Sequence, residues 1–296
     1  MSGYKKGGIL NTILELSKVR ITVAVAITTI TGYVLARKEF GVKMILPTIG
    51  IFLLACGASV INHIMENRSD SLMQRTKNRP LPSGAISIKE AVILSVIQIL
   101  TGSLVLYFST NITGLILGLA ALVWYDFIYT PLKKISANAV IPGSVIGAIP
   151  PLVGWVAAGK PLMSVQAAII AFFFFVWQVP HFYLLVLKYG KEYEKAGLPS
   201  LTQLYTMKQI KWLIFIWILV TALVALLLPL FDLTRSWITL SGLIIASIWL
   251  VSVFSKSISN RSDSFSPGRY FMKINYFVLT VVLFLVTDHL FVRFLF

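Results

Sequence analysis

The chain has 296 residues, of which 57% are hydrophobic and only 12% are charged, and its mean hydropathy is +0.84. This composition excludes a soluble globular domain and indicates an integral membrane protein. The single cysteine, Cys56, excludes an internal disulfide and a cysteine-based metal site. The net charge of +15 does not indicate nucleic acid binding, because the basic residues alternate with apolar segments. Anionic lipid and an anionic substrate explain this charge better.

Apolar segments long enough to cross a bilayer, about 20 residues each, follow one another along the whole chain. We therefore predict an all-α polytopic membrane bundle of about nine transmembrane helices around a central cavity. No Gly/Ser-rich or Pro-rich linker interrupts it, so residues 1–296 are expected to form a single transmembrane domain. The first segment is a membrane helix rather than a signal peptide, because no small-residue cleavage site follows it. The predicted spans are residues 20–36, 44–64, 89–109, 111–130, 138–158, 163–187, 211–231, 236–255 and 272–292.

The basic residues predict the orientation of this bundle. If the N-terminus is cytoplasmic, 20 of the 26 Lys and Arg residues lie on the inner side. The six on the outer side are Arg37, Lys38, Lys43, Lys160, Arg235 and Arg293. Because inner loops carry an excess of Lys and Arg, we expect a cytoplasmic N-terminus in the cell (inner or plasma) membrane. The loops after the second, fourth and sixth spans then face the cytoplasm as well.

A polar cluster follows the second span directly. Asn62, Glu66 and Asp70 are spaced i, i+4, i+8, which places their side chains on successive turns of one helix face. Such oxygen donors hold Mg²⁺ when phosphate oxygens of a substrate complete the octahedron. Carboxylates at a membrane edge are costly and usually functional. We therefore predict Asn62, Glu66 and Asp70 as catalytic residues that bind Mg²⁺.

Basic residues at the same end of the predicted bundle are suited to an anionic substrate. Arg75, Lys77 and Arg79 follow the polar cluster, and guanidinium groups bind a diphosphate in a bidentate way. For these residues taken alone, a charged loop that obeys the positive-inside rule is the simpler interpretation.

Two later segments are rich in residues that shape a cavity. Residues 138–155 contain small residues and the pair Pro150-Pro151, so this span is expected to pack closely or to open around a ligand. The sixth span ends in Trp177-Gln178-Val179-Pro180-His181-Phe182. A lone His in an apolar helix is often structural, but His181 follows a helix-breaking proline. We therefore keep a functional role for His181 as an equal alternative.

These segments resemble, in order, the motifs of the UbiA-type intramembrane prenyltransferases. The matching pieces are Asn-x-x-x-acid-x-x-x-Asp with Met-x-Arg-Thr-Lys-Asn-Arg-Pro-Leu, then Tyr-Thr-x-x-Lys-basic, Gly-Ala-x-Pro-Pro-Leu-x-Gly-Trp and Trp-Gln-x-Pro-His-Phe. The resemblance is greatest to the branch that acts on heme. It implies that Glu192 is catalytic and that Trp177, Gln178 and His181 bind the acceptor. It also implies further diphosphate-binding residues, with membrane anchoring as the alternative for the basic ones: Lys18, Arg20, Tyr129, Lys133, Lys134 and Lys188. The family mostly has Asp at Glu66 and Glu192, and often at Arg68, so the number of metal ions stays open.

The resemblance also implies the reaction. A farnesyl group would pass from farnesyl diphosphate to a vinyl group of heme B, giving heme O, after Mg²⁺-assisted ionisation of the diphosphate. His181 would offer the heme an axial nitrogen, and the proline-rich fifth span would offer it a slot. The bilayer and a downstream heme-modifying enzyme or oxidase would be the other partners. The main alternative acceptor is the aromatic ring of a quinone precursor, and further alternatives are a transporter and a non-catalytic assembly factor.

Overall fold

The computed structural model describes residues 8–234, 236–259 and 265–295, and within these ranges the chain is helical and contains no strand. The long helices are α2 (Val19–Arg37), α3 (Ile45–Leu72), α4 (Ile88–Ser109), α5 (Ile112–Val123), α8 (Val145–Ala157), α9 (Val165–Lys188), α12 (Met207–Leu227), α13 (Trp237–Ser259) and α14 (Pro267–Leu295). The short helices are α1 (Ile9–Leu16), α6 (Thr130–Leu132), α7 (Val140–Gly143), α10 (Gly190–Lys195) and α11 (Leu201–Leu204). The others are the 3₁₀ turns η1 (Val42–Met44), η3 (Ala137–Ala139) and η4 (Leu228–Phe231), and the π-helix η2 (Trp124–Tyr129).

Within the described residues, nine helices are long and apolar enough to cross a membrane, which confirms the predicted all-α bundle and its number of spans. They are Val19–Arg37, Val42–Leu72, Ile88–Ser109, Ile112–Leu132, Ala137–Ala157, Val165–Lys188, Met207–Phe231, Trp237–Ile258 and Pro267–His289. The largest difference from the prediction is in the second span. We expected this span to end at residue 64, but α3 continues to Leu72 and carries the whole polar cluster on regular helix.

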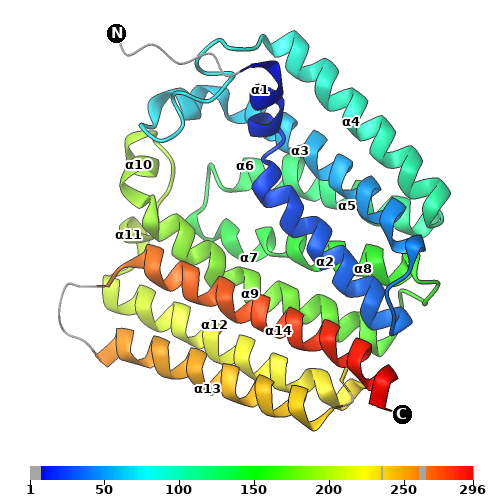
Figure 1. The fold of residues 1–296 in the computed structure, drawn as a ribbon. Coiled ribbons are helices and arrows are strands. Elements are labelled where there is room, and N and C mark those ends of the chain that lie inside the picture. Colours follow the sequence, from blue (N-terminus) through cyan, green and yellow to red (C-terminus); the bar gives the residue numbers. More distant parts are fainter. Residues whose placement is uncertain (1–7, 235, 260–264, 296) are drawn as a thin grey trace.

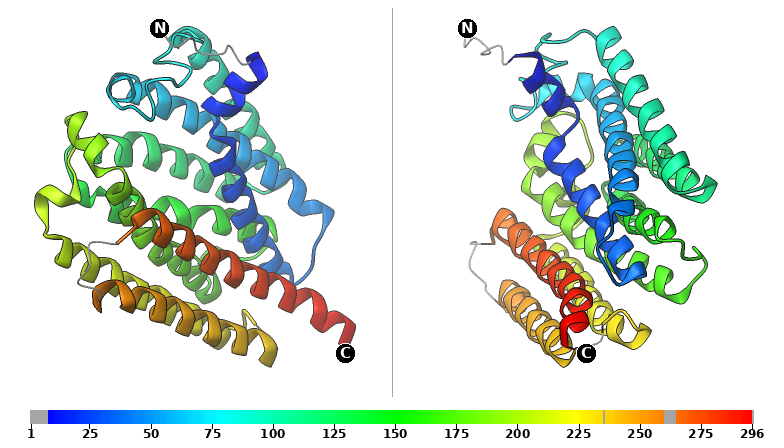
Figure 2. Two further views of the ribbon diagram at one scale, coloured as in Figure 1. Left: turned by 60° about the vertical axis from the view of Figure 1, so that its left-hand side comes forward. Right: turned by 45° about the vertical axis from the view of Figure 1, so that its right-hand side comes forward.

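The helices form two groups that meet along α2, α8 and α9. Figures 1 and 2 show α3 with α4 on one side of the bundle and α12, α13 and α14 side by side on the other. Helix α2 packs against α3 and α8, and α9 packs against α8, α12 and α14. The helix α1, the segment after α3 and the helix α10 lie together at one end of the bundle (Figure 1). We call this the site end, because the polar cluster of α3 lies there.

Local sequence signals explain where several helices begin. Ser87 and Glu90 form a capping box at the start of α4, in which each side chain bonds the backbone N–H of the other residue. The Asn111 side chain accepts bonds from the N–H groups of Thr113 and Gly114 and thereby starts α5. Ser164 caps α9 in the same way. These caps satisfy N–H groups at the membrane edge that would otherwise lack partners.

Candidate functional site

A cavity of about 240 Å³ lies at the site end, between the end of α3 and the segments that follow η2 and α9. Eight of the predicted site residues line it: Lys18, Asn62, Glu66, Asp70, Arg75, Arg79, Tyr129 and Lys133. These residues come from segments far apart in the sequence, so the fold brings them together. The other residues of its wall are Ile21, Met73, Ser136, Ala137, Ala139, Val140, Leu185, Val186, Tyr193, Leu198 and Pro199.

The three oxygen donors of α3 share one face of the helix, as their spacing predicts, and all three reach the cavity. Asn62 and Asp70 are almost fully buried, with exposed fractions of 0% and 1%. Glu66 is more open, since 12% of its side chain is exposed. Polar groups this deeply buried need partners to be stable. Each of the three has a basic side chain beside it.

The cavity pairs each oxygen donor with a cation. Lys133 forms an ion pair with Glu66, and the Arg79 Nη1 lies 2.7 Å from the Asp70 Oδ2. The Lys18 Nζ donates to the Asn62 Oδ1 at 2.6 Å. Burial by itself would lower the pKa of Lys133, but Glu66, Tyr129 and Tyr125 together outweigh this and raise that pKa above its ordinary value. The cavity is therefore charged on both sides, with carboxylates facing ammonium and guanidinium groups.

Lys18 occupies an unusual backbone position between α1 and α2. Its φ of 46° lies in the left-handed region, which residues other than glycine rarely adopt and which often marks a functional site. This break turns the side chain toward Asn62 and toward the Tyr125 hydroxyl, which accepts a bond from the Nζ at 3.2 Å. Burial is the main reason why the pKa of Lys18 falls to about 7, although Glu66 raises it. An anionic ligand in the cavity would therefore stabilise the charged form of Lys18 more than its present partners do.

The π-helix η2 contributes Tyr129 to the cavity wall and brings a second tyrosine ring close to it. Tyr125 and Tyr129 stack with ring centroids 6.1 Å apart, and the Lys133 Nζ lies 5.4 Å from the Tyr129 centroid. One residue further along the chain, the Thr130 hydroxyl accepts a bond of 2.9 Å from the Asn62 amide and holds it in place. π-helical turns of this kind occur often at functional sites.

Sequence reasoning missed Asp126 of η2. The side chain is fully buried, and neither carboxylate oxygen has a hydrogen-bond partner among the described residues. Lys18, Glu66 and Lys133 are the charged groups whose field reaches it. A buried carboxylate without hydrogen bonds is costly, and here two cations partly offset that cost. The one sequence signal for Asp126 is its position as an acidic residue beside the Tyr-Thr motif.

The connection between α9 and α12 covers the cavity. Tyr193, Leu198 and Pro199 from this segment line the wall. The Glu192 carboxylate accepts a bond of 3.2 Å from the backbone N–H of Arg75, and the Arg75 guanidinium lies 4.4 Å from the centroid of the Tyr189 ring. These contacts join the segment after α3 to the segment after α9 above the cavity.

The other predicted residues lie outside the cavity lining. Arg20, Lys77, Lys134 and Lys188 are exposed; Lys134 donates to the backbone oxygen of Met65, and Lys188 lies over the Tyr189 ring. Gln178 fills the space in front of Gly147, where its Oε1 lies 1.8 Å from the position that a Cβ would occupy. The indole N–H of Trp177 donates to the Ile274 oxygen at 3.2 Å, and His181 bonds Asn275. The three residues predicted to bind the acceptor therefore contact α8 or α14.

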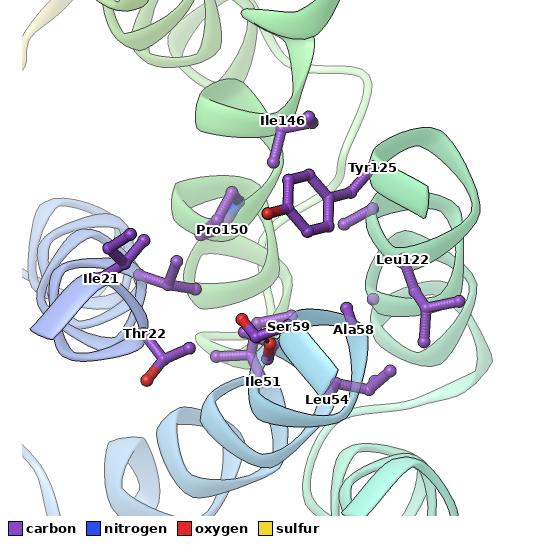
Figure 3. Close-up of a pocket in the computed structure, with 14 residues that line it drawn as sticks. Ile21, Thr22, Ile51, Leu54, Ala58, Ser59, Leu122, Tyr125, Ile146 and Pro150 are labelled. Carbon is purple, nitrogen blue, oxygen red and sulfur yellow. Dashed lines mark hydrogen bonds between the residues drawn. The ribbon is translucent and has the colours of Figure 1, made fainter. Parts of the chain in front are cut away.

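A second, smaller pocket of about 90 Å³ lies beside the charged cavity, and Ile21 lines both. Figure 3 shows its apolar walls, with the Tyr125 ring reaching toward Pro150. The hydroxyls of Thr22 and Ser59 donate to backbone oxygens of their own helices, Val19 at 3.3 Å and Ala55 at 2.8 Å. The pocket therefore offers a hydrocarbon chain a surface with few free polar groups.

Comparisons with known proteins agree with this arrangement. A protoheme IX farnesyltransferase from Oleidesulfovibrio alaskensis is 33% identical over 276 residues, which cover 93% of this chain and 95% of the relative. A solved structure described as concerning digeranylgeranylglyceryl phosphate synthase superposes with a TM-score of 0.78 at 20% identity, covering 95% of this chain and 98% of that one. A UbiA homologue from Archaeoglobus fulgidus bound to GPP and Mg²⁺ gives 0.67 at 12% identity, covering 94% and 99%. Residues 25–286 match the UbiA prenyltransferase family, and the chain therefore belongs to this family of integral membrane prenyltransferases.

Proposed function

We propose that this prenyltransferase transfers the farnesyl group of farnesyl diphosphate to a vinyl group of heme B, giving heme O, in a reaction that requires Mg²⁺. One observation carries the proposal: a cavity that holds carboxylates and cations together shares the wall residue Ile21 with an apolar pocket. An allylic diphosphate has this same polarity, with a charged head and a hydrocarbon tail. The name of the relative from Oleidesulfovibrio alaskensis supplies the acceptor and the prenyl group.

The donors on α3 fit a Mg²⁺ ion that is completed by the substrate. Glu66 and Asp70 offer carboxylates and Asn62 an amide oxygen, which are the hard ligands that this ion prefers. Among the described residues, no three His, Cys, Asp or Glu side chains converge to hold a metal ion by themselves. Diphosphate oxygens and water would therefore provide the remaining ligands. Once held there, Mg²⁺ would neutralise negative charge on the leaving diphosphate.

The ion pairs of the cavity indicate how the residues respond to the substrate. Lys133 and Arg79 now bond Glu66 and Asp70. When these carboxylates take up the metal ion, the two cations can turn to the diphosphate oxygens, and Arg75 and Lys18 stand beside them on the cavity wall. Positive groups then surround the bond between C1 and oxygen as it breaks and negative charge develops on the diphosphate.

The carbon that is left behind resembles an allyl cation. Tyr125 lines the apolar pocket and Tyr129 the charged cavity, and an aromatic face stabilises a cation by about 0.5–2 kcal/mol. Tyr193, Leu198 and Pro199 cover the cavity and limit the access of water to this carbon. The enzyme thereby favours attack by the acceptor over hydrolysis.

A heme vinyl group suits this site better than a phenol ring. A phenol ring must lose a ring proton after prenylation, which requires a nearby base. When a vinyl carbon bonds C1, the cation that forms next to the porphyrin ring takes up water as a hydroxyl and releases one proton. Glu192, the predicted acid of the second motif, bonds Arg75 and lies outside the cavity lining, so the site provides few free bases. An enzyme that modifies heme further would consume the product.

The acceptor can be tested directly. Purified protein with Mg²⁺ and farnesyl diphosphate is incubated with heme B or with 4-hydroxybenzoate, and the products are identified by mass. We expect the heme mass to rise by a farnesyl group plus a hydroxyl, and the reaction to stop when the divalent metal is chelated. Prenylated benzoate with unchanged heme would instead assign a quinone-precursor ring as acceptor. Activity that is unaffected by chelation would exclude the metal site.

The roles of the basic residues predict different mutational effects. Arg79→Ala is expected to lower turnover about 10- to 100-fold, because a hydrogen bond to a charged group contributes about 1.5–3 kcal/mol. Lys77→Ala is the control, since Lys77 is exposed and lies outside the cavity lining. It should stay within about a factor of two of wild type, as exposed charges contribute little. Equal losses in steady-state kinetics of the two variants would contradict the assignment of Arg79.

We also propose that the site end faces the cytoplasm of the cell membrane, as the distribution of Lys and Arg predicts. Single cysteines at positions 77, 195 and 160 test this in a Cys56→Ser background, because all three native lysines are exposed and Cys56 is buried. An impermeant thiol reagent applied outside intact cells should label position 160 only. Labelling of position 77 from outside would reverse the orientation and the access of cytoplasmic diphosphate.

A further inference from the structure

His181 lies on α9, one helical turn before the wall of the charged cavity. Leu185 lines the cavity wall, and His181 precedes it by four residues, which places both on the same face of the helix, one turn apart. The side chain is only partly buried. An acceptor next to His181 would therefore lie deeper in the bundle than the diphosphate, on the side where C1 of the prenyl group must react.

The hydrogen bond to α14 sets the tautomer of His181. The His181 Nδ1 lies 2.9 Å from the Asn275 Oδ1, and the oxygen of a carboxamide can only accept a hydrogen bond. Nδ1 therefore carries the proton, and the lone pair of the ring is on Nε2. Among the described residues, no other hydrogen bond to His181 occurs. The imidazole thus has the form that binds a metal ion through Nε2.

Aromatic rings hold this imidazole in place. The centroids of Phe271, Trp177 and Phe182 lie 4.5, 5.0 and 5.7 Å from the His181 ring. Phe182 stacks in turn on Tyr129 of the cavity wall, with centroids 5.7 Å apart and planes inclined by 12°. A row of rings therefore connects His181 to the cavity. A flat acceptor could stack on the faces of these rings.

We infer that Asn275 is a positioning residue, which holds His181 so that Nε2 binds the iron of the heme acceptor. This inference rests on the proposed function, because it takes heme to be the acceptor. Histidines that bind a metal ion almost always donate their other ring N–H to an acceptor, and losing that acceptor typically lowers metal affinity about 10- to 100-fold. The iron of heme is commonly held by such a His. Asn275 provides the acceptor here, from a helix 94 residues further along the chain.

Heme binding, measured apart from turnover, tests the inference. Purified full-length protein in detergent is titrated with ferric heme B, and the Soret band and spin state are recorded. We expect wild type to show the spectrum of an imidazole-ligated heme and His181→Ala to lose it, with added imidazole restoring it. Asn275→Leu should weaken binding about 10- to 100-fold. Asn275→Asp, which keeps an acceptor for the Nδ1 proton, should restore the affinity and lower the reduction potential of the bound heme.

Tyr276→Phe is the matched control, because Tyr276 is the next residue of α14 and is 55% exposed. It should bind heme like wild type, and thermal unfolding checks that every variant is folded. A wild-type spectrum for His181→Ala would refute iron ligation, and unchanged affinity in Asn275→Leu would refute the positioning role. If heme is farnesylated without any imidazole ligation, the inference fails and the proposed function stands. If only a quinone precursor is prenylated, the proposed function itself fails.

Discussion

Asp70→Asn is expected to lower prenyl transfer at least about 100-fold while the protein stays inserted and folded. Losing a partner in the second shell of a metal site already costs about 10- to 100-fold, and Asp70 is one of only two carboxylates on the cavity wall that α3 provides. The substitution keeps the size of the side chain and an oxygen that the Arg79 guanidinium can still bond at the present 2.7 Å. The free energy of unfolding should therefore fall by no more than about 1–3 kcal/mol.

Product formation and thermal unfolding have to be measured on the same preparation of Asp70→Asn. Glu90→Gln is a suitable control, because this carboxylate caps α4 away from the cavity. Activity of Asp70→Asn within a factor of a few of wild type would remove the metal-ligand assignment. If Asp70→Asn loses both activity and folding, the result would support only a structural role for Asp70 in α3.

The sequence could predict one wall of the site and not the other. Asn62, Glu66 and Asp70 lie on one helix, so their common face follows from helical geometry alone. Their partners depend on packing between helices: Lys18 is 44 residues from Asn62, and Lys133 reaches Glu66 from beyond η2. The resemblance to a family suggested Lys18 and Lys133 as diphosphate contacts, but it did not suggest that they bond the metal-binding side chains.

The fold was predictable where it depends on length and hydropathy, and less so where it depends on backbone detail. The nine spans follow from apolar stretches that match the thickness of a bilayer. Charged residues at Glu66 to Asp70 do not end a helix, so the apolar stretch alone placed the end of the second span at residue 64, whereas α3 ends at Leu72. No residue pattern in the sequence marks the π-helix from Trp124 to Tyr129. This helix nevertheless affects the directions of Tyr125, Tyr129 and the following Thr130.

The structure distinguishes between two interpretations of the small residues in the fifth span. Its glycines were compatible with close packing or with a slot for heme. Neighbouring groups fill the space in front of them: the Tyr129 ring at Gly143, the Gln178 side chain at Gly147 and the backbone of Thr29 at Gly154. The expected slot is therefore not at these glycines. Instead, they allow α2, η2 and α9 to approach α7 and α8 closely.

Gly154→Val is expected to prevent folding of the bundle. A Cβ at Gly154 would lie 1.9 Å from the Thr29 carbonyl oxygen and 2.7 Å from the Tyr33 nitrogen, and both are backbone atoms that cannot rotate away. Gly32 of α2 faces the Pro151 oxygen at the same distance of 1.9 Å, so the two helices meet through a reciprocal pair of glycines. Overpacking usually costs about 1–3 kcal/mol, and a clash between two backbones lies at or above the upper end.

The loss can be measured as the yield of monodisperse protein after membrane extraction and as the midpoint of thermal unfolding. Gly190→Ala is the matched control, since the nearest atom to its added Cβ is 3.9 Å away and alanine favours the helix α10. It should fold like wild type. Helix α2 follows Lys18 directly, and α8 follows η2 through α6, η3 and α7. Moving α2 and α8 apart would therefore also separate Lys18 from Tyr125. A Gly154→Val protein that folds and keeps its activity would show that the contact between α2 and α8 does not position the site.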